Sequence, residues 1–228
     1  MVVYGRNPVR EAIRGPRTVQ RIWATPKAAH EPWLADAKAR VERADPVELE
    51  RRCGSADHQG ICAEVSAFVY AEPAALLDAG PRLIVALDQI QDPQNLGAIC
   101  RTAECAGAGG VVIPERRSAE VTAAVCRASA GAVEHLPVAR VRNLADFLDQ
   151  AKSTGRWCYG ADAGAADNYA GVDYADSAVL VLGAEGRGLR RRVAAGCDLL
   201  VSIPLRGRTE SLNVSAAAAV LIYAIASG

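Results

Sequence analysis

Three polar segments of the chain carry side chains suited to binding a ligand. The first, residues 88–101, reads DQIQDPQNLGAICR and crowds amide and carboxylate groups ahead of Arg101. It follows an apolar run and opens a predicted helix, and α/β sheets bind ligands at the carboxyl ends of their strands. A helix cap at Asp92-Pro93 is the simpler alternative for this segment, and it stays open for Asn95.

The second segment, residues 179–189, reads VLVLGAEGRGL. A predicted buried strand ends at Gly183, and Gly186 and Gly188 flank an acid, Glu185, and an arginine. Glycines let a backbone approach a ligand closely. The spacing does not match the GxGxxG pattern of dinucleotide-binding folds, which argues against a nicotinamide or flavin enzyme. A solvated acid is the alternative interpretation of Glu185.

The third segment, residues 201–215, reads VSIPLRGRTESLNVS and leads into a helix rich in alanine. Free amides at such a helix start can hold a carboxylate or phosphate. Ser211 could simply cap the helix. Asn213 is harder to explain inside a helix, because asparagine is a mediocre helix former.

The elements that position these segments form an α/β pattern. Continuous apolar runs predict strands at 83–87, 110–113, 136–141, 157–160, 178–182 and 199–203. Helices are predicted at 95–106, 119–128, 143–153, 189–195 and 211–226. Strands buried on both faces are typical of a parallel sheet. A smaller α/β unit precedes them, with a helix at 6–14 capped by Asn7, a strand at 19–24, a helix at 31–43 and a strand at 61–69. His58 is expected to be a turn residue, with RNA contact as the alternative.

Composition narrows the class of protein. The 228 residues carry 26 basic and 26 acidic groups and are 50% hydrophobic, which excludes charge-driven disorder and a uniformly basic nucleic-acid binder. No run approaches the roughly 18 apolar residues of a membrane helix, and the start does not resemble a signal peptide. The seven cysteines are odd in number and form no CxxC pair. We therefore expect free thiols, no metal and a cytoplasmic location.

Together the three segments resemble the SpoU-type (TrmH-like) branch of the SPOUT superfamily, the RNA ribose 2′-O-methyltransferases. The matching motifs are NLGAICR at 95–101, LGAEGRGL at 182–189, and Ile203-Pro204 with SLNVS at 211–215. The resemblance is strongest to the subgroup that methylates a guanosine of 23S ribosomal RNA. Transfer RNA, another ribosomal site, or a non-catalytic RNA-binding module are the alternatives.

The resemblance implies a parallel-sheet methyltransferase domain with a trefoil knot at residues 83–228, a linker at 71–82, and a small (L30e-like) RNA substrate-binding domain at 1–70. It implies S-adenosylmethionine as cofactor and a homodimer packed through the knot region. It also implies roles for individual residues. The catalytic residues implied are Arg101, Asn95, Glu185, Ser211 and Asn213. The cofactor-binding residues implied are Leu182, Gly183, Gly186, Ile203, Pro204, Leu205, Ser211 and Leu212.

Arg101 has two candidate roles in this family reaction. It either removes the proton of the ribose 2′-hydroxyl, or stays charged, binds the adjacent phosphate and stabilises the developing alkoxide. The second role is favoured, because an arginine with a pKa above about 12 is seldom neutral. RNA contacts are expected from local basic groups, since the net charge is zero. The arginines expected to bind RNA are Arg6, Arg10, Arg187, Arg206 and Arg208.

Overall fold

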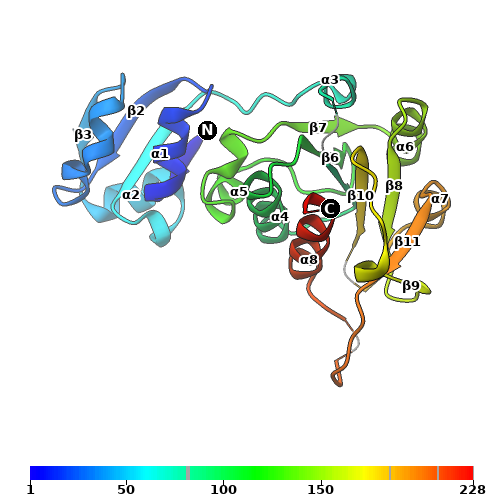
Figure 1. Cartoon of the computed structure of the whole chain (residues 1–228). Coiled ribbons are helices and arrows are strands. Elements are labelled where there is room, and N and C mark those ends of the chain that lie inside the picture. Colours follow the sequence, from blue (N-terminus) through cyan, green and yellow to red (C-terminus); the bar gives the residue numbers. More distant parts are fainter. Residues whose placement is uncertain (81–82, 185, 210, 228) are drawn as a thin grey trace.

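The computed structural model describes residues 1–80, 83–184, 186–209 and 211–227. They form two domains, each with its own sheet (Figure 1). The N-terminal sheet has the order β1-β4-β2-β3, with β2 and β3 parallel and the other pairs antiparallel. Its strands are β1 (Val2–Tyr4), β2 (Val19–Ala24), β3 (Val41–Arg43) and β4 (Ile61–Val65). Its helices are α1 (Arg6–Arg14) and α2 (Pro46–Cys53).

Two predictions for this domain were wrong. The helix predicted at 31–43 is a 3-10 turn at Pro32–Asp36, an extended Ala37 and then β3. Pairing of β3 with β2 overrides the helical pattern of this stretch. Asn7 does not cap α1, whose N-cap is Gly5 at φ 92°. His58 is a turn residue, because its Nδ1 accepts a hydrogen bond from the Gly60 amide at 2.9 Å.

The C-terminal sheet is parallel throughout, in the order β7-β6-β5-β10-β8-β11-β9. It confirms the predicted α/β class. Its strands are β5 (Ile84–Asp88), β6 (Gly110–Pro114), β7 (Val138–Val141), β8 (Trp157–Ala161), β9 (Asp167–Asn168), β10 (Ala178–Gly183) and β11 (Leu199–Ser202). Its helices are α4 (Pro93–Cys105), α5 (Ala123–Ala128), α6 (Leu144–Ser153), α7 (Arg191–Ala195) and α8 (Val214–Ala226). Three helices start later than expected, at Ala123, Arg191 and Val214.

Helices cover both faces of this sheet (Figure 1). Helices α4, α5 and α8 contribute to one buried cluster, and α3 (Pro73–Asp78), α6 and α7 contribute to the other. Strand β10 inserts between β5 and β8, and α8 returns to pack on α4 and β10. This strand order brings the carboxyl ends of β5, β10, β8 and β11 together at one edge of the sheet. The trefoil knot stays a prediction of the family resemblance.

The two domains are joined by buried polar contacts as well as by the connecting chain. The Arg17 guanidinium pairs with the Glu134 carboxylate, with 2.8 Å between Nε and Oε2, and both side chains are almost fully buried. Nearby, His135 Nε2 lies 3.0 Å from Glu11 Oε2. Helices α1 and α5 lie side by side at this interface (Figure 1).

The connecting segment is also anchored. The Ala71 amide donates to the Val138 carbonyl at 2.8 Å, and α3 packs against the edge of the large sheet. The buried Arg156 side chain donates to the Leu77 and Gly80 carbonyls at 3.1 and 2.6 Å, where α3 ends. The connecting segment was expected to be a linker around a short turn of helix; its described part contains that helix, α3, and is held against the larger domain.

Candidate active site

Two adjoining pockets lie at the carboxyl ends of the central strands. The first has a volume of about 420 Å³ and is lined by the ends of β8, β10 and β11, the loop after β11, and α8. The second has a volume of about 300 Å³ and is lined by the segment after β5, by Asn95, and by the loop after β10. Ala184, Arg187 and Val214 line both pockets. A ligand in one pocket therefore lies next to a ligand in the other.

The loop after β10 is tightly folded, which explains its glycines. The Gly188 amide donates to the Ala184 carbonyl at 2.9 Å, and Gly186 and Gly188 have φ values of 71° and 62°. A Cβ added at Gly183 would lie 2.2 Å from the Gly188 carbonyl carbon. No side chain fits at Gly183, so the wall of the first pocket is backbone at this point.

An ion pair between a buried carboxylate and a half-exposed arginine fixes the other end of this loop. The Asp88 carboxylate, 1% exposed at the end of β5, accepts from the Arg190 amide at 2.9 Å and from Arg190 Nε at 2.7 Å. Arg190 therefore ties β10's loop to β5. Arg190 stands just before α7, which begins at Arg191.

Two asparagines join the first and third polar segments. Asn213 is the N-cap of α8, because its Oδ1 accepts from the Ser215 amide at 2.9 Å. Since Oδ1 makes the cap, Nδ2 is turned toward Asn95, and it donates to Asn95 Oδ1 at 3.0 Å. The cap therefore belongs to Asn213, and the alternative of a Ser211 cap was wrong. Asn95 is 7% exposed and lies in the second pocket.

Close helix packing positions Asn95. A Cβ at Gly97 would lie 2.4 Å from the Ala128 Cβ, so glycine at this point lets α4 approach α5. Asp92 caps α4 through a 2.9 Å bond from the Gln94 amide. The helix-cap interpretation of Asp92 was therefore correct, and Asn95 projects from the first turn of a firmly packed helix.

The second pocket is markedly polar. Three amide side chains, one carboxylate and one guanidinium contribute to its lining, from Gln89, Gln91, Asp92, Asn95 and Arg187. Gln89 has φ 66°, a left-handed conformation that non-glycine residues seldom adopt. Such a lining offers both donors and acceptors, which suits a hydroxylated ligand such as a nucleoside.

The residues implied as cofactor ligands mostly gather in the first pocket. Its lining includes Leu182, Gly183, Gly186, Ile203, Leu205, Ser211 and Leu212. Pro204 is not among its lining residues. Leu205 and Leu212 are 39% and 43% exposed, which leaves apolar surface for a ligand to cover. Sequence reasoning missed the end of β8, where Asp162 lines the same pocket. Its position at the shared strand edge is the only signal that marks it.

The remaining expected residues are more scattered. Arg101 is exposed on α4 and lines neither pocket. Arg206 and Arg208 are exposed in the loop before α8 and also line neither pocket. Arg6 and Arg10 lie on α1 in the other domain, paired with Glu31 and Glu11. Glu185 lies outside the described residues, so the structure says nothing of its place.

Thiol and metal chemistry have no support at this site. Burial raises the pKa of the Cys100 thiol to about 12, which keeps it protonated at neutral pH. The described residues contain no group of His, Cys, Asp and Glu side chains suited to a metal ion. No helix in the described parts of the chain has the length and apolar character needed to cross a membrane.

Two protein families match this chain, one over each domain. Residues 82–223 match the SpoU rRNA Methylase family, and residues 2–71 match the RNA 2′-O ribose methyltransferase substrate binding family. A putative TrmH family tRNA/rRNA methyltransferase of Bacillus subtilis is 36% identical over 98% of this chain and 94% of its own. An uncharacterised tRNA/rRNA methyltransferase of Synechocystis is 42% identical over 98% of this chain, which spans 62% of that relative's length.

Solved structures of similar proteins differ in how much of this chain they cover. An AdoMet-bound rRNA methyltransferase from Sinorhizobium meliloti is 25% identical and has a TM-score of 0.81 over 98% of this chain and 85% of its own. A TrmH/SpoU tRNA modifying enzyme of A. aeolicus, also 25% identical, has a TM-score of 0.57 over 68% of this chain and 81% of its own.

Proposed function

The chain belongs to the SpoU rRNA methylase family and is an S-adenosylmethionine-dependent RNA 2′-O-ribose methyltransferase; we propose that its target is a guanosine of 23S ribosomal RNA. One observation carries the choice of ribosomal RNA. The similar structure described as an rRNA methyltransferase matches both domains, whereas the one described as a tRNA modifying enzyme covers only 68% of the chain. Guanosine rests on overall similarity to that subgroup. Transfer RNA is the second candidate, because the relatives' names include it.

The first pocket suits S-adenosylmethionine in size and lining. Its volume of about 420 Å³ lies within the range of small-molecule sites, and its wall combines apolar side chains with exposed backbone at Gly183. Bound there, the cofactor supplies a methyl group on a sulfonium. The neutral thioether that remains after methyl transfer is a good leaving group. Leu182, Ile203 and Leu212 would hold it mainly by apolar contact, with Ser211 as a polar neighbour.

The chain's own task is to present the ribose hydroxyl in line with that methyl group. The second pocket adjoins the first and is the place for the target nucleotide. The Asn95–Asn213 hydrogen bond fixes the segment between the two pockets, so the two asparagines are positioning residues. Holding the reacting groups in one geometry is a large part of catalysis when the leaving group is good. Glu185 is retained as a proposed anchor for Arg101 or the neighbouring loop.

Arg101 is assigned to the site of a partner subunit. It is exposed and lines neither pocket of its own chain, while the adjacent surface of α8 exposes apolar groups such as Tyr223 at 49%. Helices α4 and α8 pack together, so their outer faces form one surface. Packing two copies through this surface buries it and brings Arg101 to the partner's pockets. There its charged guanidinium binds the phosphate beside the target and stabilises the developing alkoxide; direct removal of the 2′-hydroxyl proton is the alternative role.

The N-terminal domain is assigned to RNA recognition, over residues 1–70, with 71–82 as the connection and 83–228 as the methyltransferase domain. Arg6 and Arg10 on α1, with Arg187, Arg206 and Arg208 near the pockets, are the proposed RNA contacts. The described cysteines are free thiols, which supports the proposed cytoplasmic location.

Labelled S-adenosylmethionine tests the target. The protein is incubated with the cofactor and with total ribosomal RNA from a strain lacking 2′-O-methylation, and labelled nucleotides are mapped. We expect one labelled guanosine ribose in 23S RNA. Label in added transfer RNA alone, or at a different ribosomal nucleotide, would replace the proposed target. A parallel reaction with ribosomal precursors determines whether assembled protein is needed, and no label in any of these RNAs would overturn the proposal.

A further inference from the structure

Three exposed arginines stand together at the carboxyl ends of β6 and β7. Arg116 and Arg117 follow β6, and Arg142 follows β7. Pro114 pairs with Val141 in the sheet register, and the Glu115 amide donates to the Val141 carbonyl at 2.9 Å. The three arginines therefore project from one edge of the sheet. Among the described residues none of them takes part in an ion pair, and none has a role in the site described above.

This edge is physically continuous with the second pocket. The Ser118 hydroxyl and the Ala119 amide both donate to the Ile90 carbonyl, at 3.3 and 2.8 Å. Ile90 lines the second pocket, between Gln89 and Gln91. The loop after β6 is thus tied to the segment after β5 at the carbonyl oxygen of Ile90. The loop that contains Arg116 and Arg117 therefore adjoins the rim of the second pocket.

The order of the strands determines how far the three arginines and the second pocket extend along the edge of the sheet. Along the edge, the sequence is β7, β6, β5 and β10, which places Arg142, then Arg116 and Arg117, then the second pocket, then the loop containing Arg187. Neighbouring strands are about 4.8 Å apart, so β7 to β10 spans about 14 Å. A few linked nucleotides of single-stranded RNA fit along such a distance.

The local charge stays positive after the acidic neighbours are counted. Arg140 lies on β7, two residues before Arg142, but it pairs with Glu120 at 3.1 Å and lies over the Tyr70 ring, so these two charges cancel. Glu115 is the exposed acid of the loop. Three unpaired guanidinium groups remain against that one carboxylate. Arginine suits phosphate because its planar fork makes two parallel hydrogen bonds to it.

We propose that Arg116, Arg117 and Arg142 bind the phosphates of the RNA strand that continues from the nucleotide in the second pocket. The surface rests on the proposed function in that RNA is the substrate. It adds a path for the strand, from the reacting nucleotide along the edge of β6 and β7. The contacts are to phosphates, so they hold the strand in place and add affinity without reading its sequence.

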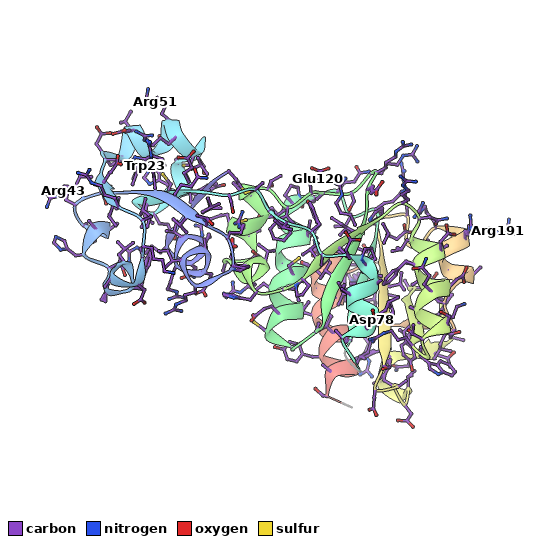
Figure 2. All side chains as sticks on the ribbon, turned by 90° about the horizontal axis from the view of Figure 1, so that it is seen from above. Trp23, Arg43, Arg51, Asp78, Glu120 and Arg191 are labelled. Carbon is purple, nitrogen blue, oxygen red and sulfur yellow. The ribbon has the colours of Figure 1, made fainter. Side chains whose placement is uncertain are left out.

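The test compares two double variants of equal charge change in the full-length protein. Arg116→Gln/Arg117→Gln removes two arginines of the path. Arg191→Gln/Arg192→Gln, the control variant, removes two exposed arginines of α7, at the end of the molecule where Figure 2 labels Arg191. Glutamine removes the charge and keeps a flexible polar side chain at both positions. Arg116→Lys/Arg117→Lys is the rescue variant, since lysine keeps the charge.

We expect the path variant to raise KM for RNA about tenfold, with kcat at saturating RNA and the cofactor Kd unchanged. The salt dependence of RNA binding separates phosphate contacts from a structural effect. Each single-stranded phosphate contact contributes about 0.7 to the slope of log K against log salt, so the slope falls by about 1.4. The control variant keeps the wild-type slope and KM, and the lysine variant restores most of the affinity.

Equal KM values and salt slopes for the path and control variants would overturn the proposal. A fall in kcat or cofactor affinity with RNA affinity unchanged would overturn it too. Failure of the proposed function has a different signature, because the wild-type protein would then transfer no methyl group to ribosomal RNA. The salt slope of RNA binding still tests the path in that case, since it needs no turnover.

Discussion

The interface between the domains and the open edge of the large sheet use arginine in opposite ways. At the interface, the Arg17 side chain is 5% exposed and is enclosed with Glu134. Burial by itself lowers the pKa of Arg17, but hydrogen bonds and the charge of Glu134 hold it above its ordinary value. At the sheet edge, Arg116 and Arg117 are exposed and take part in no ion pair among the described residues.

The difference shows that a chain with equal numbers of basic and acidic residues can contain two groups of arginines, one buried and one exposed. The buried set, with Arg17 and Arg156 as members, is held inside the fold by a carboxylate or by hydrogen bonds to carbonyl groups. The exposed set, with Arg101 and Arg116, is left for a charged ligand. A net charge of zero therefore says little about affinity for RNA, because it does not show where on the molecule the arginines and the acids lie.

The largest expected effect is on an exposed arginine. Arg101→Ala should lower turnover about 100-fold or more, the range seen when a group that stabilises transition-state charge is removed. Cofactor affinity should stay within a few-fold, because Arg101 lines neither pocket of its own chain. Single-turnover methylation and calorimetric cofactor binding measure the two quantities. Turnover near the wild-type rate would end the catalytic assignment.

Next comes the buried pair. Glu134→Gln leaves the Arg17 guanidinium enclosed without a carboxylate, and removing one partner of a buried pair costs about 3–5 kcal/mol. The midpoint of urea unfolding should fall accordingly, while cofactor affinity in the folded protein stays unchanged. The matched control, Arg17→Met/Glu134→Leu, should recover most of the loss. A single variant as stable as wild type would show that the pair is not needed to join the domains.

A smaller loss is expected where a buried arginine meets only carbonyl groups. Arg156→Met removes the hydrogen bonds to Leu77 and Gly80, each a bond from a charged donor, and should cost about 2 kcal/mol. Burial lowers the pKa of Arg156, so part of the gain from those bonds already offsets desolvation. Thermal unfolding measures the change, and proteolysis between the domains should become faster as α3 loosens. A variant with unchanged thermal stability would contradict the anchoring role.

The smallest effect belongs to an exposed pair. Arg52 bonds Glu48 one turn earlier on α2 and lies 4.2 Å from the Trp23 ring centroid. Such i,i+4 pairs contribute about 0.3–0.5 kcal/mol and an exposed cation–π contact about as much again. Arg52→Ala should therefore cost less than about 1 kcal/mol in urea unfolding. A loss as large as that of Glu134→Gln would erase the contrast between the two groups of arginines.

The sequence predicts elements that depend on residues close together in the chain better than elements that depend on pairing with distant residues. Six strands of the large sheet were predicted because each is a largely apolar run that the sheet buries wholly or in part. The seventh, β9, consists of two exposed polar residues, and it was missed because only its pairing with β11 makes it a strand. In the N-terminal domain, β1 and β3 are three residues each, and they exist because β4 and β2 pair with them. The order of apolar and polar residues along the chain does not indicate which distant strand a short segment will pair with.

The candidate site divides in the same way. Gly183 and Asn95 were found from short motifs, because tight turns and helix starts leave local signatures. The hydrogen bond from Asn213 to Asn95 joins residues 118 positions apart, which no spacing along the chain reveals. Arg6 and Arg10 were expected to bind RNA because of their charge, but sequence does not reveal that they also pair with Glu31 and Glu11.

The enclosed Arg17–Glu134 contact has a consequence for how a target is chosen. Together with the Glu11–His135 contact, it sets the substrate-binding domain at one spacing from the two pockets. We therefore expect a separation requirement on the substrate, in which the RNA element bound by the first domain and the target ribose must lie at a matching distance. On this expectation the fold of the RNA, as much as its base sequence, selects the nucleotide.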